Sequence, residues 1–140
     1  MHTTDTKLTL FASYPLGNDL KMAALVMAGL PSSLLKQLAD ALGLKPSDLA
    51  PIINISETTI LRRLQTRSKL KPDESQRVAR LMRVYVNAVE TFEDRGKTKT
   101  WLGNPLGVLG GKSPIELMAS EQGARGVEQV LGRLNNGVFA

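Results

Sequence analysis

The chain has 140 residues, no cysteine and a single histidine, His2, so disulfides, thiolate zinc sites and a histidine-based catalytic triad are not expected. Apolar residues make up 42% and aromatic residues only 4%, a composition that favours packed helices over a β-sandwich. No apolar run is long enough to cross a membrane, and the N-terminus lacks the layout of a secretion signal. We therefore expect an all-α cytoplasmic protein without membrane contact, metal or cofactor.

The net charge of +5 is concentrated in one segment. Residues 55–83 hold eight basic and three acidic side chains, and eight minus three gives +5, the charge of the whole chain. Residues 113–140 hold two arginines and three glutamates, a balance of −1. The two parts of the chain are therefore expected to meet different partners.

The N-terminal part is expected to contain an arm and two helices. Residues 1–19 show no helical period and several turn formers, so we interpret them as a flexible arm. A first helix is expected to start with Asp19 as its N-cap and to stop at Gly29. A second helix over 32–42 carries apolar residues at helical spacing and ends at Gly43.

The next stretch predicts two short helices joined by a tight turn. Ser47 is a candidate N-cap for a helix over 48–53, which Pro51 is expected to shorten or kink. Asn54 can adopt the left-handed conformation of the turn, and Ser56 can cap a second, basic helix. This pattern is typical of a helix-turn-helix. The second helix offers three apolar side chains to the core, Ile60, Leu61 and Leu64.

A helix-turn-helix of this kind predicts contacts with DNA. The first residues of the second helix would lie near base edges and the basic residues near phosphates. The predicted DNA-binding residues are Ser56, Glu57, Thr58, Thr59, Arg62, Arg63, Arg67 and Lys69. The alternative is that the basic residues form the solvated face of a helical bundle that does not bind DNA. Arg77, Arg80 and Arg83, on a long helix predicted over 72–92, are interpreted as such a solvated face.

A glycine-rich loop over 103–112 follows a linker predicted at 93–99. The residues "GGKS" at 110–113 resemble the end of a phosphate-binding loop, but no buried strand precedes them, so nucleotide binding is not expected. Ser113 then starts a short helix, and the final helix stops at Asn136. Three glycines are expected to let the backbone turn sharply between packed helices, namely Gly107, Gly110 and Gly111.

Several motifs of the C-terminal part occur together in one known family. They are Trp101-Leu102, Leu109-Gly110-Gly111, Ser113-Pro114-Ile115-Glu116-Leu117, Glu121-Gln122-Gly123-Ala124-Arg125-Gly126-Val127-Glu128 and Leu131-Gly132-Arg133. With the helix-turn-helix before them, they make the chain resemble the Xre/MbcA/ParS antitoxins over about residues 20–140, above all the members paired with RES-domain toxins. The segment "NPLGVLGG" is two residues longer, between Asn-Pro and Gly-Gly, than the Asn-Pro-Ala-Leu-Gly-Gly that is common in the family.

The resemblance implies a non-enzymatic antitoxin of a type II toxin-antitoxin system. It would bind and block a RES-domain toxin that degrades NAD and, as a homodimer within a larger complex, act as a transcription repressor on its own operator DNA. The helix-turn-helix domain is expected over 20–95 and the toxin-binding domain over 96–140. The expected toxin-binding residues are Trp101, Leu109, Gly110, Gly111, Ser113, Pro114, Arg125, Arg133, Val138, Phe139 and Ala140.

Three of these residues have a second interpretation. Trp101 can be an anchor in the core, Arg125 can pair with a glutamate of its own helix, and Phe139 can fold back on Leu134. For the whole protein, one alternative is a stand-alone dimeric helix-turn-helix transcriptional regulator without a toxin partner. A second alternative is a scaffold that binds a partner enzyme and has lost DNA binding.

Overall fold

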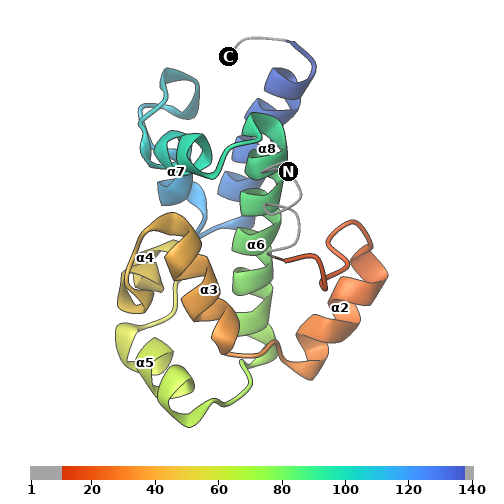
Figure 1. Ribbon diagram of the computed structural model, residues 1–140, viewed down its shortest axis with the longest axis vertical. Coiled ribbons are helices and arrows are strands. Elements are labelled where there is room, and N and C mark those ends of the chain that lie inside the picture. Colours follow the sequence, from red (N-terminus) through yellow and green to blue (C-terminus); the bar gives the residue numbers. More distant parts are fainter. Residues whose placement is uncertain (1–10, 138–140) are drawn as a thin grey trace.

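Helices form the framework of residues 11–137, the part of the chain that the computed structural model describes (Figure 1). These residues contain two isolated β-bridges and no strand, so the predicted all-α class is confirmed. None of the described helices is long and apolar enough to cross a bilayer. In chain order, the elements are α2 (Asp19–Ala28), α3 (Ser33–Leu42), the 3₁₀ helix η1 (Pro46–Leu49), α4 (Ala50–Ile53), α5 (Glu57–Thr66), α6 (Pro72–Phe92), α7 (Arg95–Gly103), the 3₁₀ helices η2 (Gly107–Leu109) and η3 (Pro114–Leu117), and α8 (Glu121–Asn135).

The ends of the first two helices are set by local signals. Gly29 ends α2 and Gly43 ends α3, both with a positive φ that favours glycine, as predicted. The predicted N-cap of α2 is wrong by one residue. The side chain of Asn18, and not that of Asp19, accepts a hydrogen bond from the backbone amide of Lys21, at 3.1 Å.

The linker predicted at 93–99 is mostly helical. Helix α7 starts at Arg95, and the preceding Asp94 caps it by accepting a hydrogen bond from the amide of Lys97 at 2.8 Å. The side chain of Thr98 is buried, and its hydroxyl donates to the Asp94 carbonyl at 2.8 Å. The polar composition of this stretch concealed a capped helix, because a single buried side chain in each turn is a weak periodic signal.

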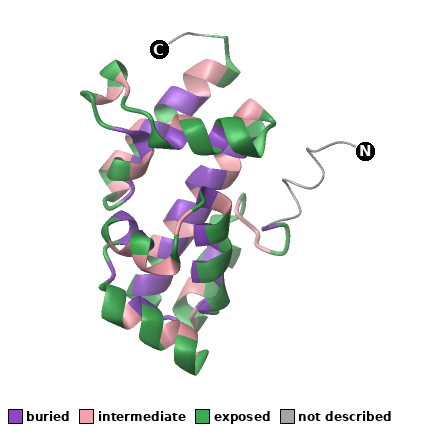
Figure 2. Ribbon diagram, turned by 60° about the vertical axis from the view of Figure 1, so that its left-hand side comes forward, coloured by how far each residue is buried: buried purple, intermediate pink, exposed green. Residues whose placement is uncertain are grey.

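Helix α6 is the centre of the molecule. It packs against α2, α3, α4, α7 and α8 and is buried along most of its length, from Glu74 to Val89 (Figure 2). The buried apolar side chains form one cluster that includes Leu35 of α3, Ile60 of α5 and Val127 of α8. Complete burial of a side chain of this size contributes about 1.5–3 kcal/mol. The helices before and after α6 are therefore stabilised by a shared core.

The segment before α2 also packs against α6. Phe11 is buried, and its ring lies perpendicular to that of Tyr85 with the two centroids 6.0 Å apart. Phe11, Tyr14 and Leu16 of the predicted arm thus contact the core, because apolar and aromatic side chains gain more from burial than from exposure to water. Residues 1–10 of the arm lie outside the described part of the chain.

The hydroxyl of Tyr85 has no hydrogen-bond partner among residues 11–137, although it is buried. A buried hydroxyl without a partner costs about 1–3 kcal/mol, so removing it should not destabilise the protein. We expect a Tyr85→Phe variant to melt at the same temperature as the wild type or a few degrees higher, measured by circular dichroism. A clear decrease in melting temperature would show that the hydroxyl has a partner.

Candidate functional surfaces

The helix-turn-helix is formed by η1, α4 and α5. Ser47 is not the N-cap of the first helix, because that helix starts at Pro46, and Asp48 accepts a hydrogen bond from the amide of Lys45 at 3.0 Å. The predicted effect of Pro51 is borne out. The 3₁₀ helix η1 gives way to the one-turn α4, in whose first positions a proline is tolerated.

The turn between α4 and α5 matches the prediction. Asn54 has a left-handed conformation, with φ 54° and ψ 49°. The hydroxyl oxygen of Ser56 accepts a hydrogen bond from the amide of Thr59 at 3.1 Å and therefore caps α5. A guanidinium nitrogen of Arg77 on α6 donates to the Asn54 carbonyl at 3.1 Å. The turn is thus tied to the central helix.

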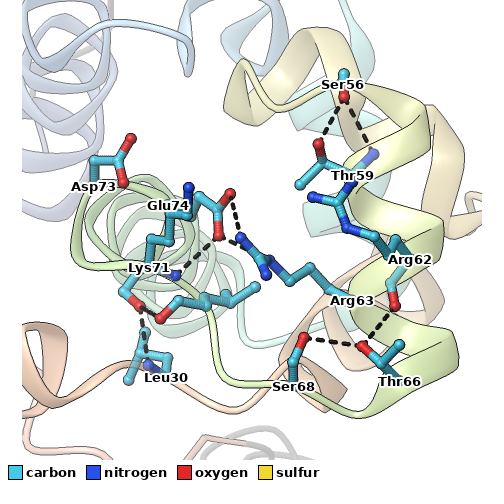
Figure 3. A network of polar contacts seen from close by, with 12 residues as sticks. Leu30, Ser56, Thr59, Arg62, Arg63, Thr66, Ser68, Lys71, Asp73 and Glu74 are labelled. Atoms are coloured by element: carbon cyan, nitrogen blue, oxygen red, sulfur yellow. Dashed lines mark hydrogen bonds and ion pairs between the residues drawn. The ribbon is translucent and has the colours of Figure 1, made fainter.

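A second contact ties α5 to α6 (Figure 3). The guanidinium of Arg63 donates from Nε and Nη2 to the two carboxylate oxygens of Glu74, at 3.1 and 3.2 Å. Glu74 also accepts a hydrogen bond from the amide of Lys71 at 2.9 Å. The side chains of Arg63 and Glu74 are only 14% and 10% exposed. The predicted DNA-binding residue Arg63 therefore has a partner inside the protein.

The remaining predicted DNA-binding residues lie on or next to α5. Ser56 and Thr59 bond to each other through their hydroxyls at 2.9 Å, so both take part in the cap. Arg67 follows α5 in a left-handed conformation. The members of the predicted set that are exposed are Ser56, Glu57, Thr58, Arg62, Arg67 and Lys69.

The side chain of Leu61, a predicted core residue, is instead 51% exposed. Gln65, one turn later, is exposed as well and was not predicted as a site residue. A signal for both existed in the sequence, because they lie four and eight residues after Glu57 and therefore on the same helical face. Ile60 confirms the prediction and is completely buried.

Arg80 and Arg83 do not form a solvated face, because α8 packs against this side of α6. Arg80 donates to Glu121 at 3.3 Å and to the Met118 carbonyl at 3.2 Å. Arg83 donates from Nε and Nη2 to the two oxygens of Glu128, both at 2.9 Å, and from Nη2 to Glu121 at 3.3 Å. Arg77 is half-buried and pairs with Asp73 at 3.4 Å. Each of the three arginines that were predicted to form a solvated face thus has a partner within the protein.

These contacts shift the pKa values of two groups between α6 and α8, Arg83 and Glu121. The hydrogen bond to Glu128 raises the pKa of Arg83 above its usual value, although burial acts in the opposite direction. Burial alone would raise the pKa of Glu121, but the charge of Arg83, the hydrogen bond from Arg125 and the charge of Arg80 outweigh it and lower this pKa. Arg83 and Glu121 are therefore charged at neutral pH, and the ion pairs hold α8 against α6.

The glycine-rich loop closes on itself. The amide of Leu106 donates to the Lys112 carbonyl at 3.1 Å, and the amide of Gly111 donates to the Leu106 carbonyl at 2.9 Å. Gly110 and Gly111 have φ values of 70° and 83°, which confirms a sharp turn at these two glycines, whereas Gly107 has no positive φ. Val108 at the tip of the loop is exposed.

The short helix η3 anchors the end of this loop. The amide and the hydroxyl of Ser113 both donate to one carboxylate oxygen of Glu116, at 2.7 and 2.9 Å. The hydrogen bond from the Ser113 amide lowers the pKa of Glu116. Ser113 and Pro114 are buried. These two predicted toxin-binding residues therefore hold the end of the loop on the core and are not part of its exposed surface.

The other predicted toxin-binding residues are dispersed. Trp101 is half-buried against Phe92, with centroids 5.3 Å apart, and lines a groove of about 640 Å³ along α7. Arg125 is exposed and pairs with Glu121 of its own helix at 3.3 Å, as the second interpretation predicted. Leu109 and Arg133 are half-buried, and Gly110 and Gly111 are exposed; Val138, Phe139 and Ala140 lie outside the described residues.

Two family models match the chain. Residues 21–83 match the antitoxin Xre-like helix-turn-helix domain, and residues 87–137 match the antitoxin Xre/MbcA/ParS C-terminal toxin-binding domain. The second match includes the glycine-rich loop and α8, which are therefore parts of the toxin-binding domain.

Three similar proteins carry antitoxin names. The chain is 40% identical over 87 residues to an "Antitoxin Xre" of Yersinia enterocolitica, an alignment that spans 61% of this chain and 59% of that protein. It is 29% identical over 128 residues to an "Antitoxin Xre" of Photorhabdus laumondii, with 91% and 86% covered. A "Prs ADP-ribosylating antitoxin" of Sphingobium is 26% identical over 124 residues, with 82% and 78% covered. The chain belongs to the Xre family of antitoxins and combines its helix-turn-helix with its toxin-binding domain.

Proposed function

We propose that the chain neutralises a RES-type, NAD-degrading toxin by direct binding and represses its own operon in the cytoplasm. One observation supports this pair of activities above all. The exposed face of α5 and the glycine-rich loop lie near opposite ends of α6 (Figure 1), so a toxin and a DNA duplex can be bound at the same time. The RES type of the toxin is supported by the motifs between Trp101 and Arg133.

The proposed toxin-binding surface starts at the glycine-rich loop. Val108, Gly110 and Gly111 are exposed there, while Ser113 and Pro114 fix the loop on the core. An exposed loop that is closed by its own hydrogen bonds loses less conformational entropy on binding than an open one, which favours affinity. Val138, Phe139 and Ala140 extend this surface in the proposal, because they follow α8 in the chain. The toxin's catalysis would be blocked by contact, without a reaction by the antitoxin itself.

The proposed homodimer uses α2. This helix projects from the bundle (Figure 1), and its apolar side chains are not all covered. Leu20 is 85% and Met27 70% exposed, and Ala24 between them is exposed as well. The three residues lie at i, i+4 and i+7, on one face. A helix that is apolar on all sides is normally buried, and a second α2 would cover this face symmetrically.

We expect the wild type to be a dimer in sedimentation equilibrium and a Leu20→Glu/Met27→Glu variant to be a monomer. Two charges on each copy would otherwise lie within the interface, where ions are strongly disfavoured. A Val108→Glu variant, with its charge on the glycine-rich loop, should remain a dimer. A monomeric wild type, or a charged α2 variant that still dimerises, would contradict this interface.

Co-expression with the product of the adjacent gene tests the main proposal. The wild type should co-purify with that product, restore growth and preserve cellular NAD. A chain without residues 136–140 and a Gly111→Trp variant should protect less, because Gly111 has a positive φ that a tryptophan adopts only with strain. Arg62→Ala should protect fully, since Arg62 lies on α5. ADP-ribosyl transfer from NAD breaks the bond between nicotinamide and ribose, the same bond that NAD degradation breaks. A loss of cellular NAD therefore indicates either reaction of the toxin.

The result also separates the alternatives. If the adjacent product neither binds the chain nor consumes NAD while the chain binds the DNA upstream of its gene, the stand-alone regulator is the correct function. If both truncation and Gly111→Trp protect fully, the toxin contacts other parts of residues 101–135.

A further inference from the structure

One large apolar side chain lies on the exposed face of α5. The exposed residues of this helix are Glu57, Thr58, Leu61, Arg62, Gln65 and Thr66, and five of them follow the spacing i, i+1, i+4, i+5 and i+8 from Glu57. That spacing places them on one stripe, with Leu61 near its middle. Leu61 is 51% exposed, while the adjacent Ile60 is completely buried. Leu61 is therefore an apolar centre on an otherwise polar surface.

Most other polar side chains of α5 are engaged within the protein. Ser56 and Thr59 form the cap, Thr66 donates to the Arg62 carbonyl at 2.8 Å, and Arg63 pairs with Glu74 (Figure 3). The exposed stripe is therefore the part of α5 that is available to bind a ligand. Arg62 lies on it, and the exposed Arg67 and Lys69 follow it in the chain. These three cations outnumber the one carboxylate of the stripe, that of Glu57, so the surroundings of Leu61 have a positive balance that is complementary to a polyanion.

Among polyanions, duplex DNA has a matching apolar feature. In the major groove, the 5-methyl group of thymine is the one apolar group on the base edges, and apolar side chains contact it. Leu61 lies four residues after the first residue of α5, which corresponds to about 6 Å along the helix. The major groove is about 12 Å wide. When the N-terminal half of α5 enters this groove, Leu61 faces its floor.

We infer that Leu61 is a specificity-determining residue that contacts a thymine methyl group in the operator. Thr58 and Arg62, which flank it on the stripe, contact the neighbouring base edges and phosphates. The inference rests on the DNA binding proposed above and adds that the operator has a thymine at a fixed position of each half-site.

Replacement of thymine by deoxyuridine tests this contact, because only the methyl group is removed. High-affinity sites are first selected from random duplexes with the full-length chain. Each thymine of the best site is then replaced in turn, and binding is measured by fluorescence anisotropy. The wild type should bind about fourfold more weakly at the contacted thymine, the effect of one methyl-sized group that is no longer buried. Leu61→Ala should bind the thymine and deoxyuridine duplexes equally.

Two variants serve as controls. Arg62→Ala should weaken binding to both duplexes by the same factor, because a contact with a phosphate or a different base edge does not depend on this methyl group. Val108→Ala shortens another exposed apolar side chain, far from α5 in sequence, and should keep the fourfold preference for thymine. Leu61→Ala should melt like the wild type, since its side chain is half-exposed and alanine favours helix.

Each outcome has a separate meaning. If the wild type selects no DNA, the proposed DNA binding fails. If it selects DNA but binds all deoxyuridine duplexes as well as thymine duplexes, DNA binding stands and the inference is wrong. The inference is also wrong if Leu61→Ala keeps the preference for thymine, or if this variant changes only dimerisation or toxin binding, because Leu61 would then belong to a protein interface.

Discussion

Replacement of Gly123 by alanine is expected to destabilise the protein by about 3 kcal/mol or more, the range of severe overpacking. A Cβ atom at Gly123 would lie 2.1 Å from the carbonyl oxygen and 2.9 Å from the carbonyl carbon of Leu117. Both are backbone atoms of η3, so no side-chain rotation relieves the overlap. The amide of Gly123 also donates to the Ser120 hydroxyl at 2.9 Å, so a shift of α8 weakens its own cap.

Gly126, three residues later in α8, provides a matched control. Apart from its chain neighbours and the backbone of its own helix, no heavy atom lies within 4 Å of the Cβ that an alanine would add there. Since alanine is the better helix former, Gly126→Ala should stabilise the protein by up to about 1 kcal/mol. Urea unfolding followed by circular dichroism measures both variants. Equal midpoints for the two variants would show that α8 does not approach η3 as closely as described.

Two adjacent arginines of α5 are expected to differ strongly in their effects. Arg63→Ala should lower the free energy of unfolding by about 3 kcal/mol, because it leaves the buried carboxylate of Glu74 without its bidentate partner. Arg62→Ala should change stability by less than about 0.5 kcal/mol, since Arg62 is exposed. DNA affinity should nevertheless decrease in Arg62→Ala, and this decrease should become smaller as salt is raised.

Urea unfolding and DNA titration of the two variants check this difference. The double variant Arg63→Ala/Glu74→Ala should regain part of the stability that Arg63→Ala loses, because no charge is then left buried. If Arg63→Ala is as stable as Arg62→Ala and loses the same DNA affinity, Arg63 reaches the phosphates and its pairing with Glu74 is not structural.

The sequence predicted those features that depend on a few consecutive residues. The left-handed turn at Asn54, the cap at Ser56 and the helix ends at Gly29 and Gly43 follow from local conformational preferences. The family motifs correctly indicated an antitoxin, since they extend over most of the C-terminal part.

Features that depend on long-range packing were missed. Nothing in residues 72–92 indicates which side of α6 will be covered by α8. The sequence therefore predicted that Arg80 and Arg83 are exposed to solvent. Leu61 lies next to Ile60 and only 100° from it around the helix, at the edge of the apolar stripe. Its spacing of four residues from Glu57 favoured exposure and its position next to Ile60 favoured burial, and the tilt of α5 against its neighbours decides between the two.

The position of α6 constrains how genes of this family can recombine. The two family models meet between residues 83 and 87, within α6. A crossover at this point inherits Arg80 and Arg83 from one parent and Glu121 and Glu128 from the other. A chimera whose parents lack complementary charges on the two helices loses these ion pairs, and apolar contacts alone then hold its α8 against α6. Antitoxins that acquire a new toxin specificity should accordingly exchange the loop and the tail more readily than the whole C-terminal half.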